Sequence, residues 1–139
     1  MNVEALAQIA QEAYSCHLLE MLCSYLGRLE FEARKDAVFL FNALVRRQAG
    51  SRTPTVEYIS AHTEILLELL RGYEKAELAL NFGLMLRECV KHENLAQFVL
   101  EREEFYLLFE YVNVPNFDVA SDAFATLKVS FILSFLYCC

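Results

Sequence analysis

Three arginines lie close together in the segment RRQAGSRTPTVEYI, residues 46–59. Guanidinium groups form paired hydrogen bonds with carboxylates and phosphates, so Arg46, Arg47 and Arg52 are candidates for anion recognition. The whole chain of 139 residues is acidic, with 12 Lys and Arg against 19 Asp and Glu and a net charge of -7. Because nucleic acids require a basic face, this balance argues against nucleic acid as the main partner. It leaves an acidic patch on another protein as the expected target of the arginines.

Residues that could act as nucleophiles or metal ligands are few and poorly spaced. Cys16 is adjacent to His17, and Cys89 is near His92, but neither pair has a third group to orient the base. The three histidines and five cysteines lack the spacing of a metal site, and no calcium-binding loop motif occurs near Asp118 or Asp122. We therefore expect no catalytic residues, no metal and no cofactor, and we interpret both aspartates as capping or solvated residues.

The elements that position these residues are predicted to be helices. Only four glycines and two prolines occur, and apolar residues recur at intervals of three and four, as in Val38, Phe41, Leu44 and Val45. The breaks predict an all-α chain with helices of about 8 to 18 residues joined by short loops. The arginine segment is one such break: Arg46 and Arg47 end a helix and Gly50 suits the left-handed residue after it.

A new helix is predicted to begin directly after the break. Thr53 is the expected N-cap, Pro54 the first helical residue, and Glu57 lies in the first turn. Arg52 lies in the loop, where helix capping gives it no role.

The helices are expected to repeat. Shifting residues 31–48 by 45 places Asp36 on Asn81, and a further shift of 41 reaches Asp122. These periods fall in the range of about 40–47 residues typical of HEAT and armadillo repeats. Two shorter helices between successive long ones predict about three helices per repeat, with the third helices side by side in a concave wall. The arginines would then form a basic rim where one wall helix ends.

Three runs of sequence resemble a known family. FEARKDAVFLFNALVRRQAGSRTPTVEYI, RGYEKAELALNFGLMLRECVKHENLA and FDVASDAFATLK closely resemble the calcium-binding protein 39 family of cytosolic armadillo-like scaffolds, over about residues 2–128. The resemblance implies a protein that is not an enzyme. It implies a concave face that holds the STRAD pseudokinase in an active-like closed conformation, in a complex with a tumour-suppressor kinase, and that also binds sterile-20-type kinases.

The resemblance and the expected geometry together give the candidate partner-binding residues. Phe117 in NFDVASDAF resembles an aromatic residue of the concave face that the family uses in kinase contact. Arg46, Arg47, Arg52 and Tyr58 match the family's segment in identity, and their contact role is inferred from the predicted basic rim.

Residues 129–139 form a separate, divergent tail in this interpretation. The family is much longer and continues this helix with charged residues, whereas VSFILSFLYCC has no charge. Eleven apolar residues are too few to span a bilayer. We therefore interpret the tail as the buried or aggregation-prone end of a truncated or spliced product. The alternative function is then an impaired or dominant-negative scaffold activity. Lipid attachment at Cys138 and Cys139 is a further alternative. With no secretory signal, no expected membrane span and an odd number of cysteines, we expect a cytoplasmic protein.

Overall fold

The computed structural model describes residues 2–137, which form nine α-helices and three short 3-10 helices with no strand among them. The α-helices are α1 (Val3–Ser15), α2 (Leu18–Tyr25), α3 (Phe31–Arg46), α4 (Pro54–Ala61), α5 (Glu64–Arg71), α6 (Ala79–Val90), α7 (Glu93–Leu100), α8 (Leu107–Tyr111) and α9 (Phe117–Tyr137). The 3-10 helices are η1 (Leu26–Arg28), η2 (Gly72–Glu74) and η3 (Glu103–Tyr106). The all-α prediction is confirmed.

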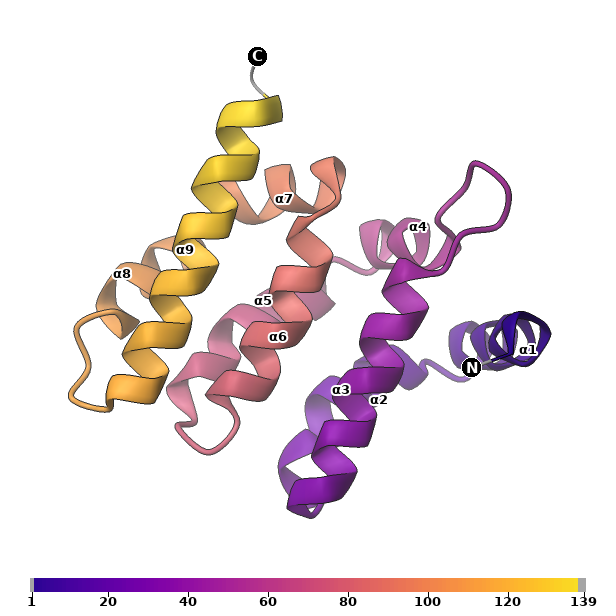
Figure 1. Ribbon diagram of the computed structural model, residues 1–139, viewed down its shortest axis with the longest axis horizontal. Helices are drawn as coiled ribbons and strands as arrows, with labels where there is room; N and C mark the ends of the chain where they lie inside the picture. The colour runs from indigo at the N-terminus through magenta and orange to yellow at the C-terminus, as the bar shows by residue number, and fades with distance from the viewer. Residues whose placement is uncertain (1, 138–139) are drawn as a thin grey trace.

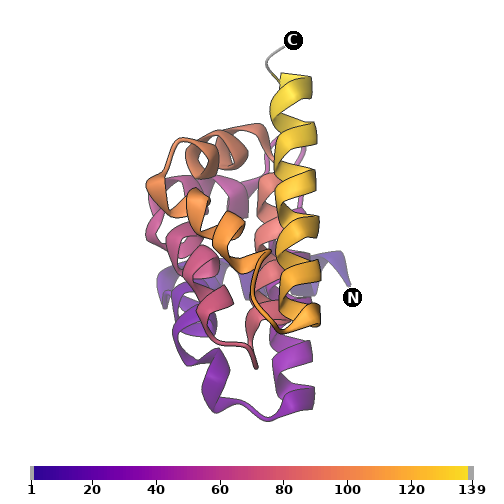
Figure 2. The same ribbon diagram turned by 90° about the vertical axis from the view of Figure 1, so that its left-hand side faces the viewer.

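The helices follow the predicted repeat, with one long helix and two shorter ones in each unit. The long helices α3, α6 and α9 stand side by side, with α6 packed between the other two (Figure 1). Turned by 90°, this row forms one side of the molecule, and the shorter helices α5, α7 and α8 lie on the other (Figure 2). We call this row the three-helix wall. Each unit buries its apolar side against its neighbours, which is how a helical solenoid builds a core.

The core consists of the inward faces of all these helices. Phe41 and Leu44 of α3, Met85 and Leu86 of α6, and Leu69 of α5 have no exposed surface. Each such side chain contributes about 1.5 to 3 kcal/mol when fully buried. Their spacing of three and four residues is the periodicity seen in the sequence, so the pattern places the core correctly.

The loop between α3 and α4 adopts the predicted turn. The α3 helix ends at Arg46, and Gly50 has a φ of 65°, a conformation that favours glycine. The backbone N–H groups of Ala49 and Arg52 each donate to the other residue's carbonyl, at 2.9 and 3.1 Å. Thr53 is the N-cap and Pro54 the first residue of α4, as predicted, although the Thr53 side chain makes no capping hydrogen bond.

The last helix is longer than the sequence pattern suggested. The α9 helix continues without a break from Phe117 through Lys128 to Tyr137, so most of the tail extends an existing helix. Its 21 residues have a mean hydropathy of 1.5 over the most apolar stretch, which by length and composition alone suffices to cross a membrane. We expected no segment of that length. Core helices of soluble proteins meet the same criterion, and the first part of α9 packs against α6 and α8. Cys138 and Cys139 lie outside the described residues.

Candidate partner-binding surface

The outward face of the three-helix wall carries large apolar side chains. Phe117, at the start of α9, is 79% exposed, and Phe124 follows seven residues later on the same side of that helix, where it lines a hollow next to Phe109 of α8. Phe39 of α3 and Leu84 of α6 are also exposed, and both point away from the buried residues of their own helices. Exposed aromatic and aliphatic side chains gathered on one face are typical of protein-binding surfaces.

A polar network fixes the position of α9 in the wall. The Arg87 Nη2 atom of α6 lies 2.8 Å from Asp122 Oδ1 of α9, and its Nη1 lies 2.9 Å from Thr126 Oγ1. The Tyr73 hydroxyl lies 2.6 Å from both Asp122 Oδ2 and Thr126 Oγ1. The Arg87 and Asp122 side chains are only 19% and 10% exposed. Asp122 is therefore not the solvated residue that the sequence suggested, because its carboxylate is satisfied inside the wall.

The surroundings of the network keep the Tyr73 hydroxyl and the Arg87 guanidinium protonated. Burial and the hydrogen bond to Asp122 raise the pKa of Tyr73, so its hydroxyl stays protonated. Burial lowers the pKa of Arg87, but Asp122 more than offsets this, so the net shift is upward. A Cβ atom on Gly83 would lie 1.9 Å from Asp122 Oδ2 and 2.6 Å from the Tyr73 hydroxyl oxygen. The network therefore fits only because residue 83 has no side chain.

At the end of α3, where a basic rim was predicted, the charges of the basic side chains are partly neutralised by Glu88. Arg46 Nε lies 3.8 Å from Glu88 Oε1 of α6, and Lys91 Nζ lies 2.9 Å from Glu88 Oε2. The Glu88 side chain is only 7% exposed and has a cation on each side. Arg46 thus helps to join the ends of α3 and α6, while more than half of its side chain remains accessible.

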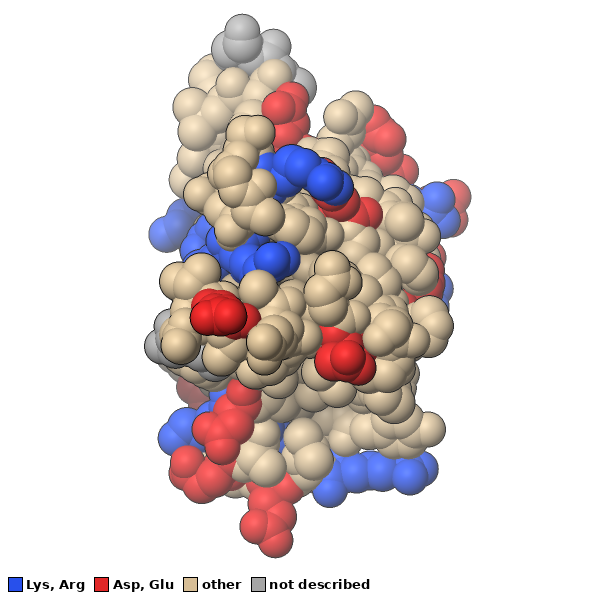
Figure 3. All heavy atoms as spheres, turned by 90° about the vertical axis from the view of Figure 1, so that its right-hand side faces the viewer, with Lys and Arg blue, Asp and Glu red and all other residues tan. Residues whose placement is uncertain are grey.

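Arg47, Arg52 and Tyr58 line a second feature, a shallow hollow of about 520 Å³ between α1, the α3–α4 loop and α4. Basic side chains gather over this loop on the face shown in Figure 3. Arg52 binds the Glu57 carboxylate through two hydrogen bonds, one of them 3.1 Å from Nε to Oε1, which lowers the pKa of Glu57. Within residues 2–137, Arg47 is half-buried and forms no side-chain ion pair.

Tyr58 has a structural role in this corner. Its hydroxyl donates to Glu20 Oε1 at 2.7 Å, and its ring stacks between Tyr14 and His62, with centroid distances of 5.1 and 4.1 Å. Burial and the hydrogen bond to Glu20 raise the pKa of Tyr58. The ring therefore connects α1, α2 and α4.

The structure divides the predicted binding residues into two groups. Phe117 lies where α9 begins, whereas Arg46 lies where α3 ends, and these are opposite ends of the wall in Figure 1. Arg47, Arg52 and Tyr58 line one hollow, Arg46 pairs with Glu88 of α6 at the end of α3, and Phe117 does not join them. Sequence reasoning missed Phe39 and Leu84, although the shift of 45 residues places one on the other.

The cysteines show no activated nucleophile among the residues the structure describes. His17 Nδ1 lies 3.1 Å from the Tyr58 hydroxyl oxygen, while the Cys16 thiol points to the Ala13 carbonyl. Cys89 is fully buried, and burial raises the pKa of its thiol. A raised pKa disfavours the thiolate, which is the reactive form.

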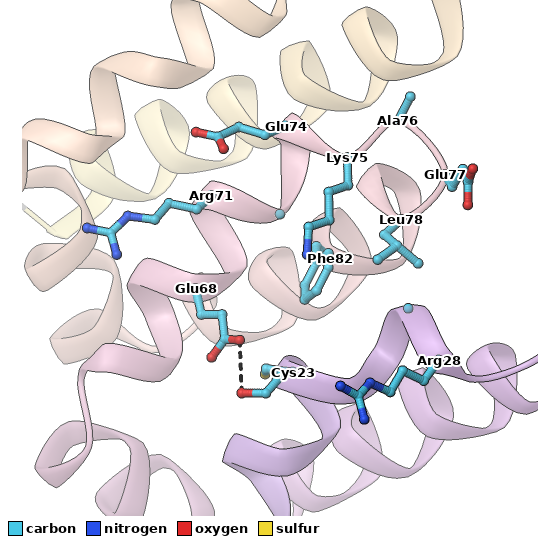
Figure 4. Close-up of a pocket in the computed structure, with 13 residues that line it drawn as sticks. Cys23, Arg28, Glu68, Arg71, Glu74, Lys75, Ala76, Glu77, Leu78 and Phe82 are labelled. Atoms are coloured by element: carbon cyan, nitrogen blue, oxygen red, sulfur yellow. Dashed lines mark hydrogen bonds between the residues drawn. The ribbon is translucent and has the colours of Figure 1, made fainter.

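A third hollow, of about 770 Å³, lies between η1 and the η2–α6 loop (Figure 4). Side chains of both charges line it, including Arg28, Glu68 and Lys75, and Glu68 accepts a hydrogen bond from Ser24 at 3.1 Å. Burial and the nearby Glu68 raise the pKa of the Cys23 thiol at its wall. The hollow thus offers mixed charge but no reactive thiolate.

Comparisons with known proteins agree with the helical repeat. The sequence model of the Mo25-like family matches residues 1–134. The chain is 54% identical over 125 residues to Calcium-binding protein 39-like from Homo sapiens, covering 90% of this chain and 37% of that protein. It is 50% identical over 127 residues to MO25-like protein 2 from Caenorhabditis elegans, covering 91% and 38%. Protein HYM1 from Saccharomyces cerevisiae is 24% identical over 135 residues, covering 92% and 34%. The chain thus spans little more than a third of the length of these relatives.

Proposed function

The chain belongs to the Mo25-like family, and from this premise we propose that it is a non-catalytic scaffold that binds protein kinase or pseudokinase domains on the three-helix wall. The proposed partners are a STRAD-type pseudokinase and sterile-20-type kinases, including their complex with a tumour-suppressor kinase. The proposal has the chain acting in the cytoplasm, with no nucleic acid or membrane as partner.

The observation that carries this proposal is the exposed face of the wall. Phe117 and Phe124 on α9, Leu84 on α6 and Phe39 on α3 are each exposed to solvent, and Phe124 also lines a hollow next to Phe109 of α8. Interface anchors are typically aromatic residues of this kind, surrounded by polar contacts. The network around Asp122 supports this surface, because its hydrogen bonds hold α9 against α6.

The proposed mechanism is differential binding. A wall that touches both lobes of a kinase only in their closed arrangement shifts the population toward that arrangement, without any chemistry of its own. The size of the shift is limited by the difference in affinity for the open and closed forms. Arg46, Arg47 and Arg52 would add charge complementarity to an acidic partner surface, an effect that acts mainly on association rate and specificity.

The test is titration calorimetry of the purified chain against a STRAD-type pseudokinase domain and a sterile-20-type kinase domain. Replacing Phe117→Ala should weaken binding by about 2 kcal/mol, close to thirtyfold, as expected for an interface anchor. The matched control is Tyr25→Ala, because Tyr25 is also exposed but lies at the end of α2, outside the wall.

Equal losses in the two variants would contradict a binding role for the wall. Absence of binding by a folded, helical chain would instead favour the second candidate function, a shortened product with impaired or dominant-negative activity. The exposed apolar end of α9, including Phe135 at 74%, is the observation that favours this alternative. Such a product would compete with a full-length relative for the same partners without activating them.

A further inference from the structure

Two of the three histidines meet at the corner between α2 and α4. His17 precedes α2, Glu20 lies in its first turn, and His62 directly follows α4. One potential ligand atom from each lies within 4.8 Å of the others. Sequence spacing does not reveal this cluster, because α3 and α4 lie between His62 and the other two residues in the chain.

The distances suit a small metal ion. His17 Nδ1 lies 3.6 Å from Glu20 Oε1. Ligands bound to a tetrahedral zinc ion at about 2.1 Å lie about 3.4 Å from one another. All three ligand atoms lie within 4.8 Å of one another, so small shifts would bring them to this spacing. Two imidazoles and one carboxylate are a donor set that zinc binds while keeping a fourth position open.

The groups around the cluster orient these ligands. His62 Nδ1 lies 2.8 Å from the Tyr58 carbonyl oxygen, so it carries the proton and leaves the lone pair of Nε2 free. The Tyr58 hydroxyl donates to Glu20 Oε1. Hydrogen bonds of this kind to metal-binding residues fix their orientation and tautomer.

Two further observations are explained by a cation at this place. The Glu20 Oε2 atom is buried and has no hydrogen-bond partner among the described residues. A buried carboxylate oxygen without a partner is unfavourable, and a cation would satisfy it. His17 has a φ of 57° and is the one non-glycine residue with positive φ in residues 2–137. Such backbone strain is typical of functional sites.

We propose that His17, Glu20 and His62 bind a divalent transition-metal ion of the zinc type. The ion connects the start of α2 to the end of α4, next to the basic corner. Its fourth position faces solvent, because the His17 side chain is largely exposed. This inference does not depend on the proposed kinase binding.

The test uses the full chain with zinc and cobalt ions alone. Competition with a chromophoric chelator should show one bound ion per chain, and the melting temperature should rise by several degrees with excess zinc. Cobalt should give visible bands typical of nitrogen and oxygen ligands, without thiolate charge-transfer bands. The same result is expected in a chain with Cys16→Ser, Cys138→Ser and Cys139→Ser, which excludes binding through these three cysteines.

Variants separate this site from adventitious binding. His62→Gln should weaken zinc binding at least tenfold, and Tyr58→Phe should weaken it by about 10- to 100-fold through loss of ligand support. His92→Gln, which removes the histidine outside the cluster, should leave affinity unchanged. Circular dichroism of each metal-free variant confirms folding. No binding by the wild-type chain, equal losses in His62→Gln and His92→Gln, or loss of binding in the cysteine variant would each overturn the proposal.

Discussion

Residues 117–130 of α9 are held in the wall by specific contacts, whereas residues 131–137 lie mostly against solvent. In the first part, Asp122 and Thr126 bind Arg87 and Tyr73. In the second part, the exposed residues are mainly large and apolar: Phe131, Ile132, Phe135 and Leu136. The less polar part of the helix is therefore the less buried part. A helix face is buried only where another element covers it, and α6 covers the first part.

The largest effect should follow from removing the cation of the network. Arg87→Ala leaves the Asp122 carboxylate buried without its partner, which should lower the free energy of unfolding by about 3 to 5 kcal/mol. Urea denaturation followed by circular dichroism measures the change. Arg52→Ala is the control, since it breaks an exposed pair and should lower stability by at most about 1 kcal/mol. Similar losses in both variants would mean that burial does not distinguish the two pairs.

A smaller effect is expected from filling the space at residue 83. Gly83→Ala places a Cβ atom against Asp122 Oδ2 and forces α9 or Tyr73 to move. Overpacking of this kind lowers stability by about 1 to 3 kcal/mol. Thermal unfolding of the variant measures it, with Gly27→Ala as the control, because the nearest contact there is a movable Leu78 methyl at 3.2 Å. A Gly83 variant as stable as the wild type would show that the network is loosely packed.

The pH dependence of stability probes the segment that the far end of α9 contacts. The Tyr137 hydroxyl donates to the Lys91 carbonyl at 2.7 Å, and His92 directly follows Lys91. Burial lowers the pKa of the adjacent His92, with a smaller lowering by Lys91 and an opposing rise from Glu88. At pH values just below about 6.5, the pKa of histidine in the unfolded chain, the unfolded chain then binds more protons than the folded chain. Stability should therefore fall as pH drops from about 6.5 through the lowered folded pKa of His92.

His92→Gln should remove this part of the pH dependence, measured as the urea midpoint at several pH values. If the variant keeps the same slope between pH 7 and pH 5, His92 is not responsible.

The smallest change in stability is expected on the exposed end of α9. Phe135→Lys should change the free energy of unfolding by no more than about 0.5 kcal/mol, because the Phe135 side chain is already 74% exposed. It should at the same time reduce binding of an apolar fluorescent dye. Leu133→Lys is the matched control, since Leu133 packs against the core and its replacement should destabilise. A strongly destabilised Phe135→Lys variant would show that residues 131–137 are held as firmly as the first part of the helix.

The sequence predicted most of the helices and the turn between α3 and α4. Apolar spacing identified core residues such as Phe41 and Leu44, and Gly50 identified the left-handed turn residue. These features depend on neighbouring residues in the chain, so a sequence pattern contains them. The same reasoning gave the exposed Arg52 but not its ion pair with Glu57.

The tertiary structure decided the features that join distant segments. Asp122 was expected to be solvated, and it is buried only because α6 places Arg87 beside it. His17, Glu20 and His62 meet only because the start of α2 lies near the end of α4. Phe117 is separated from the arginines because α3 and α9 run in the same direction, so the start of α9 and the end of α3 lie at opposite ends of the wall. Local periodicity fixes which face of a helix is apolar. It does not determine which other helix lies against that face, because that depends on packing between residues far apart in the chain.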